Sequence, residues 1–269
     1  MPVPALGYRI EDEDHDWLET NAVKGTFSDS AEPPPDEIDV RSIIQLWNQL
    51  NMGSCSGHSG AHLSAYLNWI GSGGDSVQRF SRMWCYLRAQ QASGYFGSDQ
   101  GATITGLVKA LMEHGVCLES SFPYPNQYNT AIPASATDSA AAHKILGHST
   151  LRSYAQVFSW LSNKFGGVSI GIPWTAGIAQ CTGVAELSAR GGQNYGGHAL
   201  AYMGYSKRKD RAGRNYLWLA NSHGPSYGNR GWVEVAPDLV EYYCQQRTCE
   251  TIGIMTLQTF DPDKLAVRM

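Results

Sequence analysis

The feature that most constrains the fold is a change of period along the chain, from helical in the first half to strand-like in the second. Over residues 55–70 apolar side chains recur three and four positions apart, which predicts a buried helix starting near Cys55. The same period predicts further helices. Apolar runs bounded by Gly or Asn then predict strands. The helices are expected at 80–92, 103–115 and 154–165, and the strands at 168–174, 198–205, 216–221, 231–235 and 251–256.

Helices thus precede strands instead of alternating with them, which is typical of an α+β protein. We expect two lobes within residues 39–269, helical over about 39–140 and β-rich over about 141–260, with the chemistry in a cleft between them. Residues 1–38 contain EDEDHD and EPPPDE and show no sustained period. We expect an irregular acidic and proline-rich extension there.

Charge and hydropathy exclude several classes of protein. The net charge is -4 without a dense basic run, so nucleic acid is not an expected partner. No apolar stretch reaches the roughly 18 residues that span a bilayer, and the N-terminus lacks the pattern of a signal peptide. The six cysteines have no CxxC spacing, which favours free thiols in a reducing, cytoplasmic setting.

Four polar residues in separate segments can supply the parts of a thiol-based hydrolase. Cys55 lies where a Gly-Ser turn enters a helix, and a helix N-terminus should lower the pKa of its thiol. His198 opens an apolar strand after two glycines and could be its base, with Asn221 as orienting group and Gln49 as oxyanion donor. The plainer interpretations are a buried Cys55 that only packs and a turn asparagine at 221.

Four blocks in order make the resemblance to a family specific. NQLNMGSCS contains Gln49 six positions before Cys55, and His198 follows Cys55 by 143 positions, within the spacing typical of papain-like enzymes. GGVSIGIPW, GGHALAYMGY and YLWLANSHGPSYGNRGWVEV follow. The chain therefore resembles the papain family of cysteine peptidases over nearly its whole length. The segment GSDQGATITGLVKALMEHGVCLESSFPYP is most similar to the bacterial and phage branch, which lacks a long inhibitory propeptide.

This resemblance implies a papain-like fold, hydrolysis of peptide or protein substrates and no cofactor. It also implies that Gln49 and the backbone N–H of Cys55 form the oxyanion hole. Gly101 and Ala102 would border the substrate groove, and Gly197 would join them in binding substrate. A phage origin would make the protein virion-associated instead of cytoplasmic.

Three residues depart from the family pattern: Met52, Ser56 and His223. His223 replaces a tryptophan that covers the bond between Asn221 and His198, so we expect that bond to be better hydrated. The acidic segment 1–38 should have too little apolar surface to fill the cleft as an inhibitory propeptide does.

Three alternatives compete with a peptidase. Cys55, His58 and His62 share one helix at i, i+3 and i+7 and could hold zinc, although no fourth ligand is evident. A papain-like module with weak turnover could serve as a binding or structural part, for example of a virus particle. An amidase acting on cell-wall peptides would use the same thiol.

Overall fold

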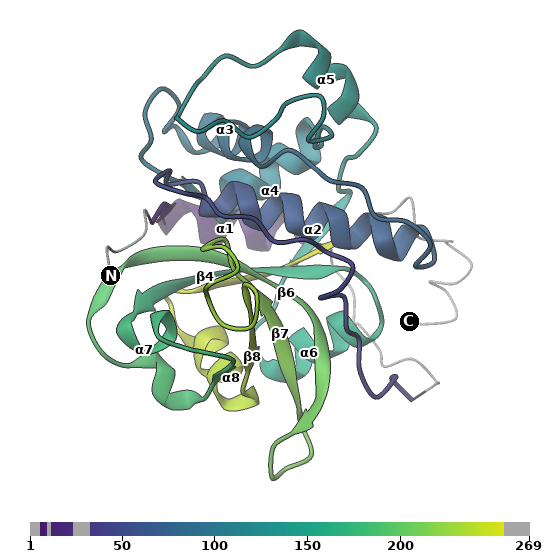
Figure 1. Cartoon of the computed structure of the whole chain (residues 1–269), viewed down its shortest axis with the longest axis vertical. Helices are drawn as coiled ribbons and strands as arrows, with labels where there is room; N and C mark the ends of the chain where they lie inside the picture. Colours follow the sequence, from purple (N-terminus) through teal and green to yellow (C-terminus); the bar gives the residue numbers. More distant parts are fainter. Residues whose placement is uncertain (1–5, 10–11, 24–32, 256–269) are drawn as a thin grey trace.

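The computed structural model describes residues 6–9, 12–23 and 33–255, and it has two halves of different content (Figure 1). Helices α2 to α5 form one half, while a sheet with its own flanking helices forms the other. This confirms the predicted α+β class and two-lobed fold. The helices are α1 Asp12–Asn21, α2 Cys55–Gly71, α3 Arg82–Ser93, α4 Ile104–Glu113, α5 Ala134–Ala141, α6 Tyr154–Ser162, α7 Ala176–Ala179, α8 Pro237–Gln245 and the 3-10 helix η1 Leu187–Arg190.

The sheet of the second half has seven strands in the order β3-β9-β4-β6-β7-β8-β5 among the described residues. Its neighbours pair antiparallel except β5 and β8, which are parallel. A separate parallel pair joins β1 near the N-terminus to β2. The strands are β1 Tyr8–Arg9, β2 Ala102–Thr103, β3 Gly147–Thr150, β4 Gly167–Thr175, β5 Val184–Ala185, β6 Asn194–Lys209, β7 Asn215–Ala220, β8 Trp232–Val235 and β9 Glu250–Met255.

Helix α2 is the helix of the first half that packs against the sheet, and it is buried from Cys55 to Leu67. Two glycines let it approach its neighbours closely. A Cβ on Gly57 would lie 2.4 Å from the carbonyl oxygen of Arg82, and one on Gly60 would lie 2.6 Å from Leu107. The helix is therefore fixed against α3 and α4 on one side and against β4 and β6 on the other, and its first residue is held in place between the halves.

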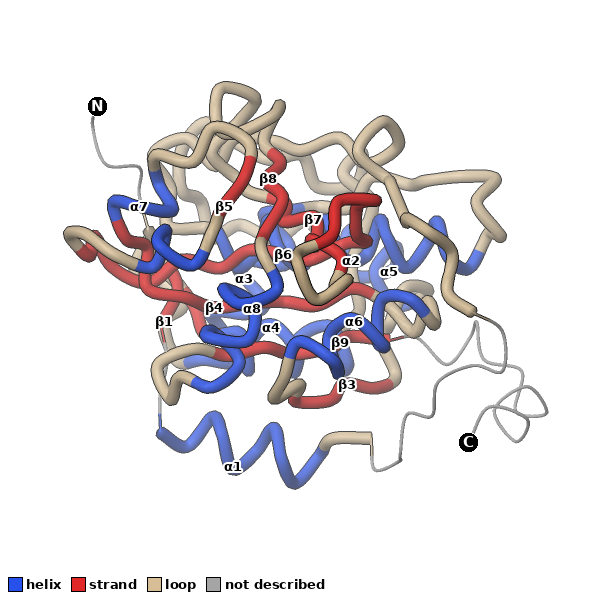
Figure 2. Tube along the Cα trace, turned by 90° about the horizontal axis from the view of Figure 1, so that it is seen from below, coloured by secondary structure: helices blue, strands red, loops and turns tan. Residues whose placement is uncertain are grey.

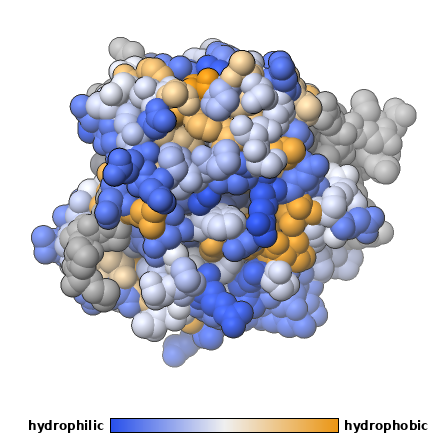
Figure 3. All heavy atoms as spheres, turned by 45° about the horizontal axis from the view of Figure 1, so that its top comes forward, coloured by the Kyte–Doolittle hydropathy of each residue, from blue (hydrophilic) through white to orange (hydrophobic). Residues whose placement is uncertain are grey.

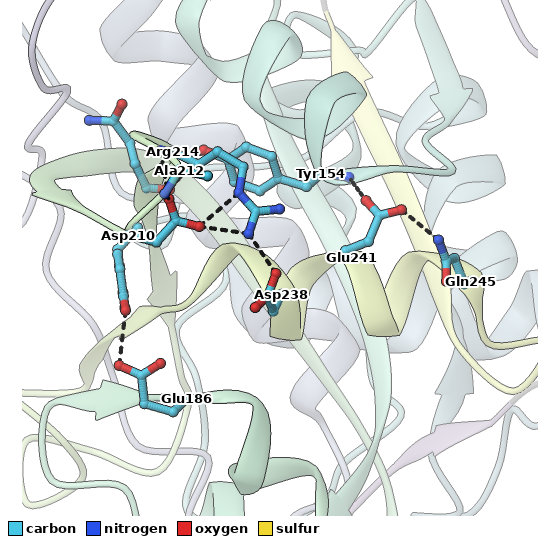
Figure 4. Close-up of polar contacts among 10 residues, drawn as sticks. Tyr154, Glu186, Asp210, Ala212, Arg214, Asp238, Glu241 and Gln245 are labelled. Atoms are coloured by element: carbon cyan, nitrogen blue, oxygen red, sulfur yellow. Dashed lines mark hydrogen bonds and ion pairs between the residues drawn. The ribbon is translucent and has the colours of Figure 1, made fainter.

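Strands β6 and β7 form a long hairpin whose far end is tied to α8 (Figure 4). Arg214 donates from Nε to Asp210 Oδ2 (2.7 Å) within the hairpin turn and from Nη2 to Asp238 Oδ1 (2.5 Å) on α8. Glu241 on α8 also accepts from the backbone N–H of Tyr154 at the start of α6 (2.7 Å). The hairpin is thus anchored at the end opposite to the residues of the site.

The N-terminal extension is not irregular throughout, which corrects one expectation. Helix α1 lies along the edge strand β3, where Figures 1 and 2 place it on the outside of the sheet. Trp17 stacks on His148 with ring centroids 5.3 Å apart, and Leu18 is buried. The acidic composition of this stretch hid two apolar residues that are enough to dock one helix face on the sheet edge.

The surface in Figure 3 is largely hydrophilic, with apolar residues gathered in separate patches. Exposed large apolar side chains are spread along the described chain, from Val23 to Leu146. Among the described residues, no helix has the length and apolar character needed to cross a bilayer.

Candidate active site

Cys55 is the first residue of α2 and is fully buried. The N-cap residue Ser54 does not cap the helix, because its hydroxyl lies 2.5 Å from the hydroxyl of Tyr124 instead. Burial raises the pKa of the Cys55 thiol, while backbone N–H groups, those of Ala199 and Gly7 foremost, lower it. The expected depression of this pKa is wrong for the covered arrangement seen here, since burial outweighs the N–H groups.

His198 and Asn221 meet because β6 and β7 pair with Ala201 opposite Ala220. His198 Nε2 lies 2.8 Å from Asn221 Oδ1. The backbone N–H of Ser222 donates to the same oxygen (2.7 Å), which marks it as the amide acceptor, so Nε2 of His198 carries the proton. His198 Nδ1 then keeps its lone pair and has no hydrogen-bond partner in the described part of the chain. It is available as a base.

His223 stacks on His198 with ring centroids 4.5 Å apart, and Trp174 packs edge-on against both rings. Asn221 Nδ2 lies 3.4 Å from His223 Nδ1. Burial, then the charge of His223, lowers the pKa of His198, and burial lowers that of His223 to about 4. The expectation of a better hydrated His198–Asn221 bond is wrong: Trp174 and His223 flank His198, and the bonded pair is only 0% and 1% exposed.

Gln49 joins the loop before α2 to the strand end that carries Asn221. Its Nε2 donates to the carbonyl oxygen of Met52 (2.8 Å), and its Oε1 accepts from the hydroxyl of Ser222 (2.5 Å). Its backbone N–H donates to the carbonyl of Ser222 (2.8 Å). Gln49 is fully buried and couples both halves at the site. Its service as an oxyanion donor stays a prediction.

The chain's own residues Leu6–Arg9 lie across Cys55. Strand β1 runs parallel to β2, and the backbone N–H of Ala102 donates to the carbonyl of Gly7 (2.8 Å). A Cβ on Gly7 would lie 1.7 Å from the carbonyl oxygen of Gly53, two residues before Cys55, and the N–H of Gly7 is among the groups that lower the pKa of the Cys55 thiol. The nucleophile candidate is therefore covered by a short strand of the same chain.

The three residues predicted to bind substrate, Gly101, Ala102 and Gly197, all border this strand. A Cβ on Gly101 would lie 2.0 Å from the carbonyl oxygen of Gly7, and one on Gly197 would lie 2.5 Å from the carbonyl oxygen of Tyr8. Only glycine at these positions allows an extended backbone to pass so close. They form the walls of one groove, and substrate binding by them stays a prediction.

The position of this strand overturns the expectation that residues 1–38 have too little apolar surface to fill the cleft. Tyr8 is only 7% exposed. Leu6 lies 3.4 Å from the place a Cβ on Gly196 would take. The acidic composition of the whole segment concealed the short stretch LGY, which supplies the apolar contacts.

The alternative zinc site at Cys55, His58 and His62 is not formed. His58 Nδ1 donates to the carbonyl of Ser54 one turn earlier (3.1 Å), and the ring packs edge-on against Tyr124. Across residues 6–9, 12–23 and 33–255, no group of three or more His, Cys, Asp or Glu side chains is arranged to hold a metal ion.

Sequence reasoning missed three residues of this site. Trp174 ends the strand segment GIPW, and Ser222 directly follows Asn221, so both lay inside blocks already singled out. Glu250, whose carboxylate contacts Tyr8, had no local signal. It is 242 positions away from its partner.

A two-lobed α+β fold, with Cys55 at the start of α2 and the bonded His198–Asn221 pair on the β6–β7 hairpin, is the architecture of papain-like proteins. A family model described as papain family cysteine protease matches residues 34–253. The chain belongs to the papain family of cysteine proteases. No curated protein sequence matches it.

Solved structures share this fold. Xylellain, a cysteine protease from Xylella fastidiosa, is 19% identical with a TM-score of 0.69, over 94% of this chain and 96% of that one. Bromelain protease from Ananas comosus, solved with the E64 inhibitor, is 18% identical with a TM-score of 0.64, over 82% and 99%. At such identities the likeness shows the fold, and the bacterial or phage branch stays a prediction.

Proposed function

We propose that this cysteine peptidase hydrolyses peptide bonds with Cys55 as nucleophile and His198 as its base. The observation that carries the proposal is the bond from His198 Nε2 to Asn221 Oδ1, because it leaves the lone pair of Nδ1 for the thiol proton. Strand β6 lies beside α2, because the hydroxyl of Ser59, one turn after Cys55, donates to the carbonyl of Leu200 (2.9 Å), and the N–H of Ala199 is among the groups that lower the pKa of the thiol. The base and nucleophile candidates therefore belong to neighbouring backbone segments.

The chemistry then follows two half-reactions. The thiol proton passes to His198 Nδ1, and the thiolate attacks the substrate carbonyl carbon. The oxyanion accepts from the backbone N–H of Cys55 and the amide of Gln49. The C–N bond breaks as His198 returns the proton to the leaving amine, and water activated by His198 then hydrolyses the thioester. Asn221 stabilises the imidazolium that forms in each step.

The covered groove corresponds to a resting form of this mechanism. Burial raises the pKa of the Cys55 thiol and lowers that of His198, so the neutral pair is favoured over the thiolate and imidazolium. Displacement of Leu6–Tyr8 admits water and weakens both effects. The ion pair needed for attack should therefore form when the strand leaves.

The test compares Cys55→Ala with Cys181→Ala, which removes a thiol of the same size outside the groove. Both changes are made in the full chain and in a Gly7→Ala background, because a Cβ at Gly7 would lie 1.7 Å from the carbonyl oxygen of Gly53 and should expel the strand. Hydrolysis of denatured casein and of fluorogenic peptides is measured. We expect no turnover from Cys55→Ala and normal turnover from Cys181→Ala. Turnover that survives in Cys55→Ala would contradict the proposal.

A further inference from the structure

The hydroxyl of Tyr124 lies between the loop that carries Gln49 and the residue before the nucleophile. It donates to the backbone carbonyl oxygen of Gln49 (3.0 Å) and lies 2.5 Å from the hydroxyl of Ser54. A phenol has one proton, so once that proton is given to Gln49 the Ser54 hydroxyl is the donor of the second bond. One chain of hydrogen bonds therefore runs from Ser54, the neighbour of Cys55, through Tyr124 to Gln49.

Both partners of the Tyr124 hydroxyl are in the protein interior. Gln49 and Ser54 are each 0% exposed. A buried polar group costs free energy when its hydrogen-bond partner is taken away. Removal of the phenol oxygen would leave the Ser54 hydroxyl without this partner, and it would take one of two donors from the Gln49 carbonyl, which also accepts from the N–H of Met52 (3.2 Å).

The ring of Tyr124 is itself held by the helical half. The backbone N–H of Tyr124 donates to Glu119 Oε1 (2.9 Å), and Arg82 Nη2 on α3 donates to the same oxygen (2.5 Å). The guanidinium of Arg82 lies 4.4 Å from the centroid of the Tyr124 ring, and His58 on α2 packs edge-on against it at 5.0 Å. The hydroxyl is therefore presented from a fixed support that involves both helices.

The two expected donors of the oxyanion hole need such a support. The amide of Gln49 and the backbone N–H of Cys55 are separated by residues 50–54, and this loop contains Leu50 at a φ of 56°. A left-handed backbone at a leucine is strained, so surrounding contacts must maintain it. Oxyanion donors act only when they lie about 2.7–3.1 Å from the developing charge. The bonds of Tyr124 join the two ends of this loop from outside.

We infer that Tyr124 is a positioning residue of the oxyanion hole, because its hydroxyl fixes Gln49 relative to the backbone N–H of Cys55. This inference rests on the proposed peptidase function. Tyr124 acts through Gln49 and Ser54, so its hydroxyl should matter in the steps that form an oxyanion. It should not matter in a reaction of the thiol that forms none.

The experiment compares two reactions of the same thiol in the full chain with Gly7→Ala. Tyr124→Phe removes only the hydroxyl and should lower kcat for a fluorogenic peptide by about ten-fold, with KM changed less than about two-fold. In alkylation by iodoacetamide, the Cys55 thiolate displaces iodide from a saturated carbon, and the thiol proton passes through His198 to the buffer. No oxyanion forms, so this rate should change less than about two-fold.

A peptide nitrile gives a second readout of the hole. The thiol adds across the C≡N bond, with sulfur on carbon and the proton on nitrogen, and that nitrogen takes the place of the carbonyl oxygen. Tyr124→Phe should therefore raise the inhibition constant of the nitrile by about ten-fold. Tyr216→Phe is the matched control, since it removes a hydroxyl that is bonded to Glu186 (3.0 Å) at β7. It should leave all three measurements unchanged.

Ser54→Ala breaks the same chain of hydrogen bonds from its other end and carries the test if Tyr124→Phe does not fold. It should lower kcat in the same way, and the double variant should lose no more than the weaker single variant, because both changes remove one linkage. Unchanged kcat in Tyr124→Phe, or equal losses in hydrolysis and alkylation, would overturn the inference and leave the peptidase function intact. Neither hydrolysis nor alkylation of Cys55 in the Gly7→Ala parent would overturn both.

Discussion

Two pairs of histidines in this molecule are similar in burial and in the direction of their pKa shifts, but we expect only one pair to take part in catalysis. His58 and His62 lie on α2, and His198 and His223 lie at the ends of the β6–β7 hairpin. Burial lowers the pKa of all four, to about 3 for His62. Each of these four rings has one nitrogen without a hydrogen-bond partner in the described part of the chain.

The difference lies in what holds the other nitrogen. His58 Nδ1 donates to the backbone carbonyl of Ser54, the N-cap residue of its own helix (3.1 Å). His198 Nε2 donates to the side-chain oxygen of Asn221 (2.8 Å), and the N–H of its strand neighbour Ala199 is among the groups that lower the pKa of the Cys55 thiol. Burial, a lowered pKa and a free ring nitrogen are therefore shared features. An orienting side chain and a place beside the nucleophile are what distinguish a catalytic base.

The largest effect should come from removing the base. His198→Ala should lower kcat/KM by about 10³-fold or more, because the thiol loses its proton acceptor and the leaving amine loses its acid. His62→Leu is the control from the other pair and should change kcat/KM less than threefold. Steady-state kinetics in the Gly7→Ala background measure both. Similar losses of kcat/KM in the two variants would contradict the assignment of His198, and not His62, as the catalytic base.

Replacing His62, from the pair on α2, should change how the unfolding free energy depends on pH. The native pKa of His62 lies below its unfolded value, so its contribution is present above about pH 6.5 and is lost as the pH falls toward 3. Over pH 6 to 4, His62→Leu should therefore reduce the pH slope of the unfolding free energy by about 1.4 kcal/mol per pH unit. Urea unfolding at several pH values tests this. An unchanged slope would mean that His62 is protonated in the folded state.

The smallest effect concerns His223. Its pKa of about 4 keeps it neutral near pH 7, and its proton repels the imidazolium of His198 only in acid. His223→Trp should therefore shift the acid limb of the kcat/KM profile to lower pH by less than about one unit, with the alkaline limb unchanged. Superimposable profiles would show that the stacked ring carries no charge during catalysis.

The sequence allowed prediction of most elements and of the catalytic candidates. The period of apolar residues located α2, α3, α4 and α6, and the spacing of Cys55 and His198 pointed to the family later shown by its model. Such signals are local, so a short window of residues carries them. His198 and Asn221 lie on two strands that are consecutive in the chain, so their pairing in one hairpin could also be predicted from the sequence.

Contacts between distant segments could not be predicted. Tyr8 and Glu250 meet only because the N-terminal strand crosses the groove to reach β9, and neither residue has an unusual neighbourhood in sequence. Averaging composition over residues 1–38 also concealed the stretch LGY that fills the groove and the face of α1 that docks on β3. The low hydration of the His198–Asn221 bond could not be predicted either, because it depends on a tertiary contact, the packing of Trp174 against the ring of His198.

The most direct test of the central claim is to identify the thiol that reacts. The full chain with Gly7→Ala is treated with an epoxysuccinyl peptide, its intact mass is measured and the labelled residue is mapped. The account predicts one adduct per chain, located at Cys55 and strongly reduced by His198→Ala but not by His62→Leu. Labelling at any other of the six cysteines, or no adduct at all, would contradict it.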